Sequence, residues 1–251
     1  MSELDAIEAK NVAKTFRIYH EKRNAVFDHL INIANKENHF EELVVLDDVS
    51  FTVRKGEMLG VIGRNGSGKT TLLRLIARIF KPNKGIIRTN GTIVPLLELG
   101  TGFQADLTVR DNIIQYGIIL GFTKKEITSR VDNILQFAEL GKFFDTKIKN
   151  FSSGMIARLA FSTAIQVEPD ILLVDEILAV GDMPFQQKSY NAFLSFKEQK
   201  RTIVYVSHDI DSVKKLCDRA ILLEKGKIES IGEPRKVVDD YLRILNGQNQ
   251  R

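Results

Sequence analysis

The stretch GRNGSGKT at residues 63–70 constrains the fold more than any other part of the 251-residue chain. It matches the pattern G-x-x-x-x-G-K-[ST]; an apolar run through Ile62 precedes it, and apolar residues at helical spacing follow from Lys69 to Phe80. Strand, glycine loop and helix form a phosphate-binding loop, because the loop amides and the amino end of the helix face the same anion. We expect Lys69 to reach the β- and γ-phosphates and Thr70 to hold Mg²⁺. The residues expected to contact the nucleotide are Gly63, Arg64, Asn65, Gly66, Ser67, Gly68, Lys69, Thr70 and Thr71.

A second apolar run, ILLVDE at residues 171–176, ends in two carboxylates. A buried parallel strand that ends in Asp175 and Glu176 sets both at the carboxyl edge of the sheet, where ligands bind in such folds. We expect Asp175 to coordinate Mg²⁺ through water and Glu176 to accept a proton from an attacking water. The pair favours hydrolysis over simple nucleotide storage.

A histidine follows a third apolar strand in TIVYVSHDI, residues 202–210. At the carboxyl end of a strand, His208 can reach the γ-phosphate with a ring N–H and sense or polarise it. A lone histidine at such a place is more often an incidental capping residue. The assignment of His208 therefore depends on the two motifs before it.

Strand and helix signals alternate along the chain, which predicts an α/β fold with a largely parallel sheet covered on both faces. Residues 49–53 read as an antiparallel strand ahead of the buried one, part of a small antiparallel β subdomain. The further strands are expected at 92–97, 171–175, 202–206 and 219–224.

The whole chain, 1–251, is expected to form one P-loop domain. Its core with the antiparallel part would span about 1–103 and 166–235, and an inserted helical subdomain about 104–165. A C-terminal helix is expected at about 236–246.

Residues 20–43 place Phe27, Leu30, Ile31 and Ala34 on one helical face. This helix could pack on its own sheet or face a partner, and the sequence leaves both open.

Composition limits the compartment and the partners. Lys and Arg number 36 against 32 Asp and Glu, and this excess is a weak hint of an anionic neighbour. Cys217 is the single cysteine, so no intramolecular disulfide forms and a reducing compartment fits best. The apolar runs are shorter than the roughly 20 residues of a spanning helix, and the polar N-terminus has no secretion signal. Any work at a membrane would go through a partner.

Two serines and a glycine open a further helix in NFSSGMIARLAFS, residues 150–162. Read alone, this is an ordinary serine cap. Its order between GRNGSGKT and ILLVDE, with His208 behind, resembles the nucleotide-binding subunit of ABC transporters over nearly the whole chain. FSSGM is then a variant of the family signature LSGGQ, and its Ser and second Gly match.

The departures from the family pattern resemble one branch. FSSGM followed by DEILAVGD, where most members have DEPTSALD, is similar to exporters of O-antigen, capsule and teichoic acid. The insertion at 20–43 and the segment VPLLELGTGFQADLTVRDNI at 94–113 fit that branch too. The resemblance implies an ATPase that forms a homodimer and binds a separate membrane permease, on the cytoplasmic face of the cell membrane. The cargo would be a lipid-linked glycan.

The resemblance also implies roles for single residues. In a head-to-tail dimer, Ser152, Ser153 and Gly154 would contact the partner's ATP. Asp182 matches the D-loop aspartate of the family. Phe16 matches the aromatic residue that stacks on adenine, with Tyr19 as a close alternative. For the family's Mg²⁺-sensing glutamine the choice is Glu98, ahead of Leu99 and of Gln104, which comes late in the sequence.

Some O-antigen exporters of this branch carry an added C-terminal domain that recognises the chain end of the glycan. This chain ends at Arg251 after one helix. If the sequence is complete, cargo selection by such a domain is absent.

Other classes of function fit less well. Soluble ABC ATPases of DNA repair or ribosomes carry long coiled coils or two cassettes, and here no sustained heptads appear and each motif occurs once. The guanine motif Asn-Lys-x-Asp of GTPases is not found, since residues 35–38 end in Asn, and a small-molecule kinase would not need FSSGM with DEILAVGD. We expect no nucleic-acid partner. Within the transporters, another exported cargo such as a lipid or a drug is the alternative.

Overall fold

The computed structural model describes residues 2–19, 40–97, 99–175 and 181–248. Its central sheet has six strands in the order β5-β6-β7-β3-β8-β9, and β9 alone runs antiparallel. This confirms the expected α/β class with a mostly parallel sheet. Three of the four strand predictions match at both ends, and the strand expected at 92–97 is shorter. The strands are β3 (Met58–Ile62), β5 (Ile93–Leu96), β6 (Ile171–Asp175), β7 (Thr202–Val206), β8 (Arg219–Glu224) and β9 (Lys227–Gly232).

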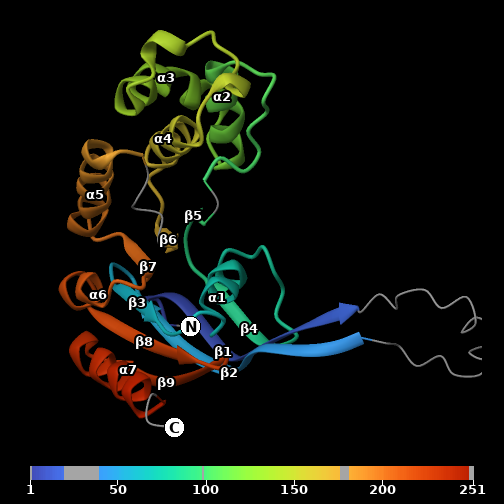
Figure 1. Cartoon of the computed structure of the whole chain (residues 1–251), viewed down its shortest axis with the longest axis vertical. Helices are drawn as coiled ribbons and strands as arrows, with labels where there is room; N and C mark the ends of the chain where they lie inside the picture. Colours follow the sequence, from blue (N-terminus) through green and yellow to red (C-terminus); the bar gives the residue numbers. More distant parts are fainter. Residues whose placement is uncertain (1, 20–39, 98, 176–180, 249–251) are drawn as a thin grey trace, which may run out of the picture.

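A second, antiparallel sheet has the order β2-β1-β4. Its strands are β1 (Asp5–Tyr19), β2 (Phe40–Arg54) and β4 (Lys84–Thr89). The pairing of β1 with β4 ends at Ala13, whereas β1 and β2 remain paired as far as Tyr19 and Phe40. Residues 14–19 and 40–46, called the ribbon below, therefore project from the sheet as two strands (Figure 1).

The segment 20–43, expected to form a helical face followed by a charged tail, ends in a strand. Residues 40–43 are strand, because their backbone pairs with residues 16–19, and this pairing excludes helical hydrogen bonds. The rest of that prediction, residues 20–39, lies outside the described residues.

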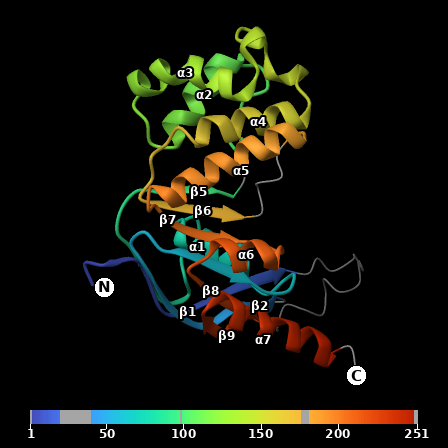
Figure 2. The ribbon, with the colours of Figure 1, turned by 90° about the vertical axis from the view of Figure 1, so that its left-hand side faces the viewer.

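Each face of the central sheet buries its own core (Figure 2). One face packs on α1 (Lys69–Ile76) and the antiparallel sheet. The other packs on α5 (Met183–Glu198), α6 (Ile210–Leu216) and α7 (Pro234–Gln248). This double cover explains why the parallel strands are nearly continuous apolar runs. The last helix contains the predicted range 236–246 and is longer at both ends.

Helix α1 ends earlier than the sequence pattern predicts. It stops at Ile76, because Arg78 takes a left-handed conformation with φ 62° that a helix cannot continue. Ile79 is 57% exposed instead of facing the core, and Phe80 turns back to pack on Phe16.

The helices that lie between β5 and β6 in the sequence pack around a third core. It consists of α2 (Val109–Ile119), α3 (Lys124–Ala138), α4 (Ser153–Ala164) and the short turns η1 (Gly141–Phe143) and η2 (Ile148–Asn150). These elements form the helical end of the molecule in Figure 1, beyond β5 and β6. Helix α4 also contributes Phe161 to the main core, so it joins this end to the sheet.

Candidate nucleotide site

The phosphate loop lies between β3 and α1, as the motif requires. Gly63 leaves β3 with φ 151°, and a Cβ there would lie 2.0 Å from the carbonyl oxygen of Leu223. Gly68 precedes α1 with φ 107°, and a Cβ there would lie 2.7 Å from Leu46. Because Gly68 has no side chain to cap the helix, the first amides of α1 are available to an anion.

Lys69 is the cation of the loop and is only 7% exposed. Its Nζ donates to the carbonyl oxygens of Gly63, at 2.8 Å, and Arg64, at 2.9 Å. Burial lowers the pKa of Lys69, and the negative charges of Asp175 and Glu224 oppose that shift. The ammonium thus lies over the loop and can exchange its two carbonyl partners for phosphate oxygens.

The rest of the loop divides into an exposed tip and a buried base. Arg64, Asn65 and Gly66 are exposed, while Ser67 is 3% exposed. Ser67 Oγ makes no hydrogen bond within the described part of the chain. Thr71 lies half-buried on the first turn of α1. The tip is therefore open to a ligand, while the base of the loop is buried.

Thr70 and Asp175 meet although they are 105 positions apart, with Thr70 Oγ1 donating to Asp175 Oδ2 at 2.9 Å. Hydroxyl and carboxylate oxygens are the donors that Mg²⁺ prefers, and this ion usually binds one or two protein groups, substrate phosphates and several waters. Among the described residues no cluster of three or more His, Cys, Asp or Glu side chains could hold a metal. The Thr70–Asp175 pair therefore fits a Mg²⁺ that binds together with a nucleotide.

His208 follows β7 at the same edge of the sheet and is exposed. Burial lowers its pKa, the positive charge of Lys69 lowers it further, and Asp175 acts in the opposite direction. The imidazole is thus neutral near pH 7 and keeps one ring N–H. Capping of α6 falls to Asp209, whose Oδ1 accepts from the amides of Asp211 and Ser212, so His208 is not the capping residue.

Sequence reasoning missed Glu224, the last residue of β8. It is 9% exposed, and its Oε2 makes no hydrogen bond within the described part of the chain. Strand β8 pairs with β3 beside the loop, and the charge of Glu224 acts on Lys69. The signal was present: RAILLE, like ILLVDE, is an apolar run that ends in an acid.

FSSGM begins α4 as the sequence predicts. Ser152 is the N-cap, and its Oγ accepts from the amide of Met155 at 3.2 Å. Ser152 and Ser153 are exposed, and Gly154 is half-exposed. Figures 1 and 2 show α4 at the helical end and α1 on the other side of β5 and β6. The chain does not bring this helix start to its own phosphate loop.

The aromatic candidates lie on the ribbon. Phe16 is half-buried, with its ring 5.5 Å from that of Phe80, and Lys14 Nζ lies 5.0 Å from its centre. Phe16 pairs with Leu43 on β2. Leu43 lies three residues from Leu46, which packs on Gly68, and three residues of a strand span roughly 10 Å. Tyr19 is 72% exposed beside Phe40. A hollow of about 440 Å³ near Phe16 is lined by Thr15, Phe16, Arg17, Glu42 and Asn83.

The remaining candidates are Asp182, Glu98, Glu176 and Gln104. Asp182 caps α5 by accepting from the amide of Phe185 at 3.3 Å. Glu98 and Glu176 lie outside the described residues. Gln104 is exposed, and its backbone is held by the buried side chain of Asn112.

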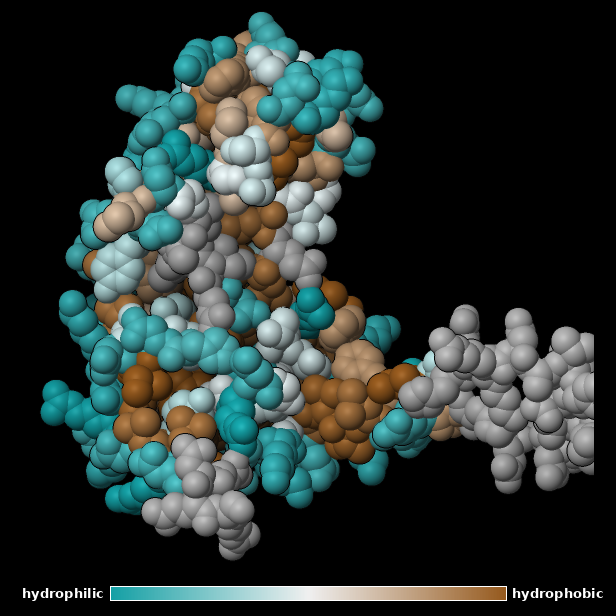
Figure 3. Space-filling view, in the orientation of Figure 1, coloured by the Kyte–Doolittle hydropathy of each residue, from teal (hydrophilic) through white to brown (hydrophobic). Residues whose placement is uncertain are grey.

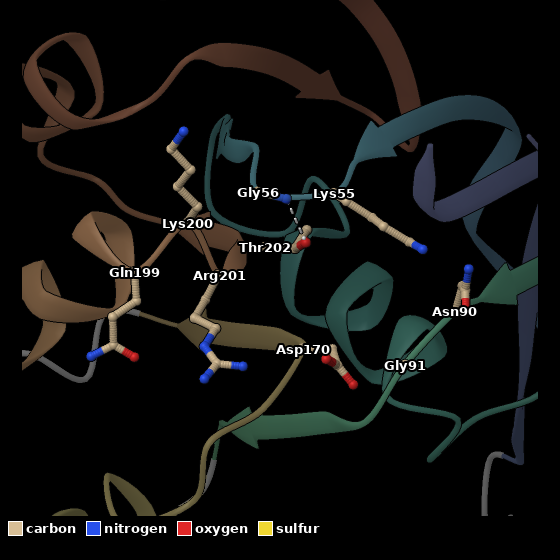
Figure 4. A pocket seen from close by; sticks show the side chains of 9 residues that line it. All are labelled: Lys55, Gly56, Asn90, Gly91, Asp170, Gln199, Lys200, Arg201 and Thr202. Atoms are coloured by element: carbon tan, nitrogen blue, oxygen red, sulfur yellow. Dashed lines mark hydrogen bonds between the residues drawn. The ribbon is translucent and has the colours of Figure 1, made fainter. Parts of the chain in front are cut away.

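A separate hollow of about 320 Å³ lies at the opposite, amino edge of the central sheet (Figure 4). It is lined by the ends of strands and turns, including Lys55, Asp170 and Lys200. The two lysine side chains point apart in Figure 4, and Asp170 Oδ2 accepts from Thr92. This hollow does not gather groups that would act together.

Comparisons with known proteins give the class and the family. Solved structures show the fold of an ATP-binding cassette: the post-hydrolysis dimer of the cassette MJ0796 bound to ADP and Pi has a TM-score of 0.69 and 24% identity, covering 91% of this chain and 99% of that one. A family model described as ABC transporter matches residues 46–179. The chain belongs to the ABC transporter family, as an ATP-binding subunit.

Two relatives are similar along nearly the whole chain. The O-antigen export system ATP-binding protein RfbB of Klebsiella pneumoniae is 41% identical over 244 residues, which cover 95% of this chain and 98% of that one. The teichoic acids export ATP-binding protein TagH of Bacillus anthracis is 36% identical, over 97% of this chain and 44% of TagH. These likenesses confirm the resemblance to the branch of O-antigen and teichoic acid exporters.

Among the helices that the structure describes, none is both long enough and apolar enough to span a bilayer.

Proposed function

We propose that this chain hydrolyses ATP as the motor subunit of an exporter for a lipid-linked polysaccharide. The observation that carries the proposal is the Thr70–Asp175 hydrogen bond, which joins GRNGSGKT to ILLVDE beside the buried Lys69. This arrangement supports the binding of a nucleotide with its Mg²⁺ rather than of a bare phosphate.

The nucleotide would lie along the loop, with Lys69 and the amides of α1 at its phosphates and the ring of Phe16 against its base. The hollow beside Phe16 supports this choice over Tyr19, and so does the position of Phe16 on the ribbon, nearer than Tyr19 to the part of β2 that packs on Gly68. Thr70 and Asp175 would hold Mg²⁺, with Glu98 as the further candidate. The bound ion would neutralise charge on the β- and γ-phosphates.

Hydrolysis needs a base and a donor at the γ-phosphate. Glu176 follows Asp175 directly and would take the proton of the attacking water. His208, with its lowered pKa, would be neutral and donate a ring N–H to a γ-phosphate oxygen. The neutral state avoids a second cation beside Lys69.

The second half of each site would come from another copy of the chain. The exposed start of α4 offers hydroxyls and backbone amides but lies away from the loop of its own chain. In a head-to-tail homodimer, Ser152, Ser153 and Gly154 would contact the partner's γ-phosphate, and Asp182 would lie near the same interface. Closure on ATP would then drive the transporter.

The names of the relatives support the proposed class of cargo. RfbB and TagH are named for the export of O-antigen and teichoic acids. The variant signature FSSGM followed by DEILAVGD in this chain supports the same class of cargo. The chain would bind a separate permease at the cytoplasmic face of the membrane, and the permease would carry the glycan.

The substitution Glu176→Gln tests the proposed reaction. It keeps the size of the side chain but removes the base, so kcat should fall by about a hundredfold or more while the ATP dissociation constant changes little. Steady-state phosphate release and equilibrium nucleotide binding measure the two effects. Glu168→Gln is the control, since Glu168 is 69% exposed and pairs with Arg201. Normal turnover by Glu176→Gln would contradict the assignment of the base.

A further inference from the structure

Arg158 lies on α4 three residues after FSSGM, and its side chain is only 17% exposed. Its Nη2 donates to Asp182 Oδ1 at 2.5 Å, and its Nη1 lies 3.7 Å from Glu139 Oε2. The guanidinium also lies over the ring of Phe185, 4.8 Å from its centre. One side chain therefore contacts the ends of two other helices.

A second cation, Lys188, contacts Glu139 together with Arg158. Glu139 caps α3 in a left-handed conformation, and Lys188 of α5 donates to Glu139 Oε1 at 3.3 Å and to the carbonyl of Phe137 at 2.9 Å. The hydrogen bond from Arg158 lowers the pKa of Asp182, so the Asp182 carboxylate stays ionised at neutral pH.

The backbone before α5 is shaped to admit the guanidinium. Gly181 has φ 76°, and a Cβ there would lie 3.1 Å from Arg158 Nε and 3.2 Å from Phe185 Cδ1. A side chain at this position would push Arg158 away from Asp182. Gly181, Asp182 and Phe185, at the start of α5, thus form the binding site for the Arg158 side chain.

We propose that Arg158 is a positioning residue that makes the FSSGM helix and the start of α5 move as one body. The proposal rests on the proposed function, in which FSSGM acts on the partner's nucleotide and Asp175 acts on the chain's own. Thr70 donates to Asp175, and Arg158 donates to Asp182, the residue that caps α5. Arg158 thus joins the helix that would act on the partner's nucleotide to the helix that follows Asp175 in the sequence.

Charge alone does not explain this arrangement. Asp182 is 62% exposed and Glu139 55%, and ion pairs with exposed partners add little to stability. A guanidinium stacked on Phe185 holds a fixed orientation that an ammonium cannot reproduce. The effect of Arg158 should thus appear in turnover rather than in the stability of the fold.

The substitution Arg158→Met tests the proposal in the purified full chain. Methionine keeps much of the packing on Phe185 but removes the forked contact, so kcat should fall about tenfold to a hundredfold from misplacement of reacting groups. The ATP dissociation constant should stay within about twofold, because Arg158 is not part of the phosphate loop. Arg158→Lys should recover only part of the rate.

Arg130→Met is the matched control. Arg130 also lies over a phenylalanine, 5.0 Å from the ring centre of Phe122, and donates to the carbonyl of Gln166, but it does not contact Asp182. It should keep wild-type kcat. An equal loss of kcat in both methionine variants would reduce Arg158 to a general packing residue.

A double-mutant cycle with Asp182→Asn gives the second readout. If the two side chains act as a unit, Arg158→Met with Asp182→Asn should be no slower than the slower single variant. Multiplied losses would overturn the proposal, as would a loss of ATP affinity that matches the loss of kcat. If the wild-type chain itself neither forms a dimer with ATP nor hydrolyses ATP, the proposed function fails instead.

Discussion

At the scale of single residues, the proposed nucleotide site contains the buried cation Lys69, whose pKa is lowered by burial and raised by two nearby carboxylates. Lys69 loses water on burial, which favours its neutral form, and Asp175 and Glu224 favour the charged form. Asp175 also contacts Thr70 and so belongs to the proposed metal site. Glu224 makes no such contact through its Oε2. Its influence on Lys69 is therefore electrostatic.

This balance predicts a pH-dependent effect of Glu224→Gln on ATP binding. Removing the carboxylate lowers the pKa of Lys69 further, so the loop loses its cation, and its affinity, at a lower pH than the wild type. At lower pH, where Lys69 stays charged in both proteins, the loss of a negative charge near the phosphates should tighten binding instead. ATP dissociation constants measured from pH 7 to pH 10 should give curves that cross.

The control for this experiment is Glu229→Gln, because Glu229 is exposed on β9, the next strand of the sheet. It should follow the wild-type curve. A uniform change at every pH in Glu224→Gln would show that the carboxylate acts only through packing.

Some residues of this site can be predicted from the sequence, and others cannot. Lys69, Thr70 and Asp175 follow from motifs in which the chemistry and the strand end lie within a few residues. The role of Glu224 depends on β8 being the neighbour of β3, and the strand order of a sheet is not written in local spacing. Arg158 was missed for the same reason, since Asp182 is 24 positions away and meets it only in the fold.

At the scale of elements, the phosphate loop is held between two other backbones. The β8–β9 turn supports it from one side, where the amide of Gly226 donates to the carbonyl of Ser67 at 3.1 Å. Strand β2 closes the other side, with Val45 and Leu46 against Gly68. Gly226 itself lies against Val45, where a Cβ would be 2.5 Å from the carbonyl oxygen. The loop and these two segments thus pack so closely that Gly68 and Gly226 have no room for a side chain.

This packing predicts that Gly226→Ala destabilises the protein. At φ 79° the left-handed conformation alone costs an alanine about 1–2 kcal/mol, and the contact with Val45 adds to that cost. Gly121→Ala separates the two effects, since Gly121 has φ 104° but nothing within 4 Å of its Cβ position. Thermal and denaturant unfolding should show a larger loss for Gly226→Ala, with weaker ATP binding in that variant alone. Equal losses would mean that conformation, not crowding, limits the site.

Elements buried on both faces were predicted well, and those defined by long-range pairing were not. β6, β7 and β8 match because a short apolar run between turn signals has few other interpretations. The amphipathic pattern at 20–43 favoured a helix, yet residues 40–43 pair with β1. Helix α1 was overextended because spacing alone does not reveal the turn at Arg78.

At the scale of the whole molecule, the two proposed halves of the nucleotide site lie in different parts of the chain. The phosphate loop lies at the edge of the central sheet, and the start of α4 lies at the helical end. In Figure 3 the surface is hollowed between the helical end and the ribbon. The sequence supplied both motifs and their order, but only the fold shows that one chain keeps them apart. A second copy is the simplest way to complete both sites.

That geometry predicts that Ser152→Arg prevents the ATP-dependent dimer. Ser152 is exposed and its side chain makes one local cap, so arginine should cost about 1 kcal/mol in helix capping but leave the fold and the phosphate loop intact. A long cation at the proposed γ-phosphate contact should block closure of the head-to-tail pair. In the Glu176→Gln background, ATP should produce dimers by light scattering, and the added Ser152→Arg should leave monomers that still bind ATP. Ser129→Arg, on the exposed surface of α3, should dimerise normally. Dimers of unchanged stability with Ser152→Arg would rule out a contact through FSSGM.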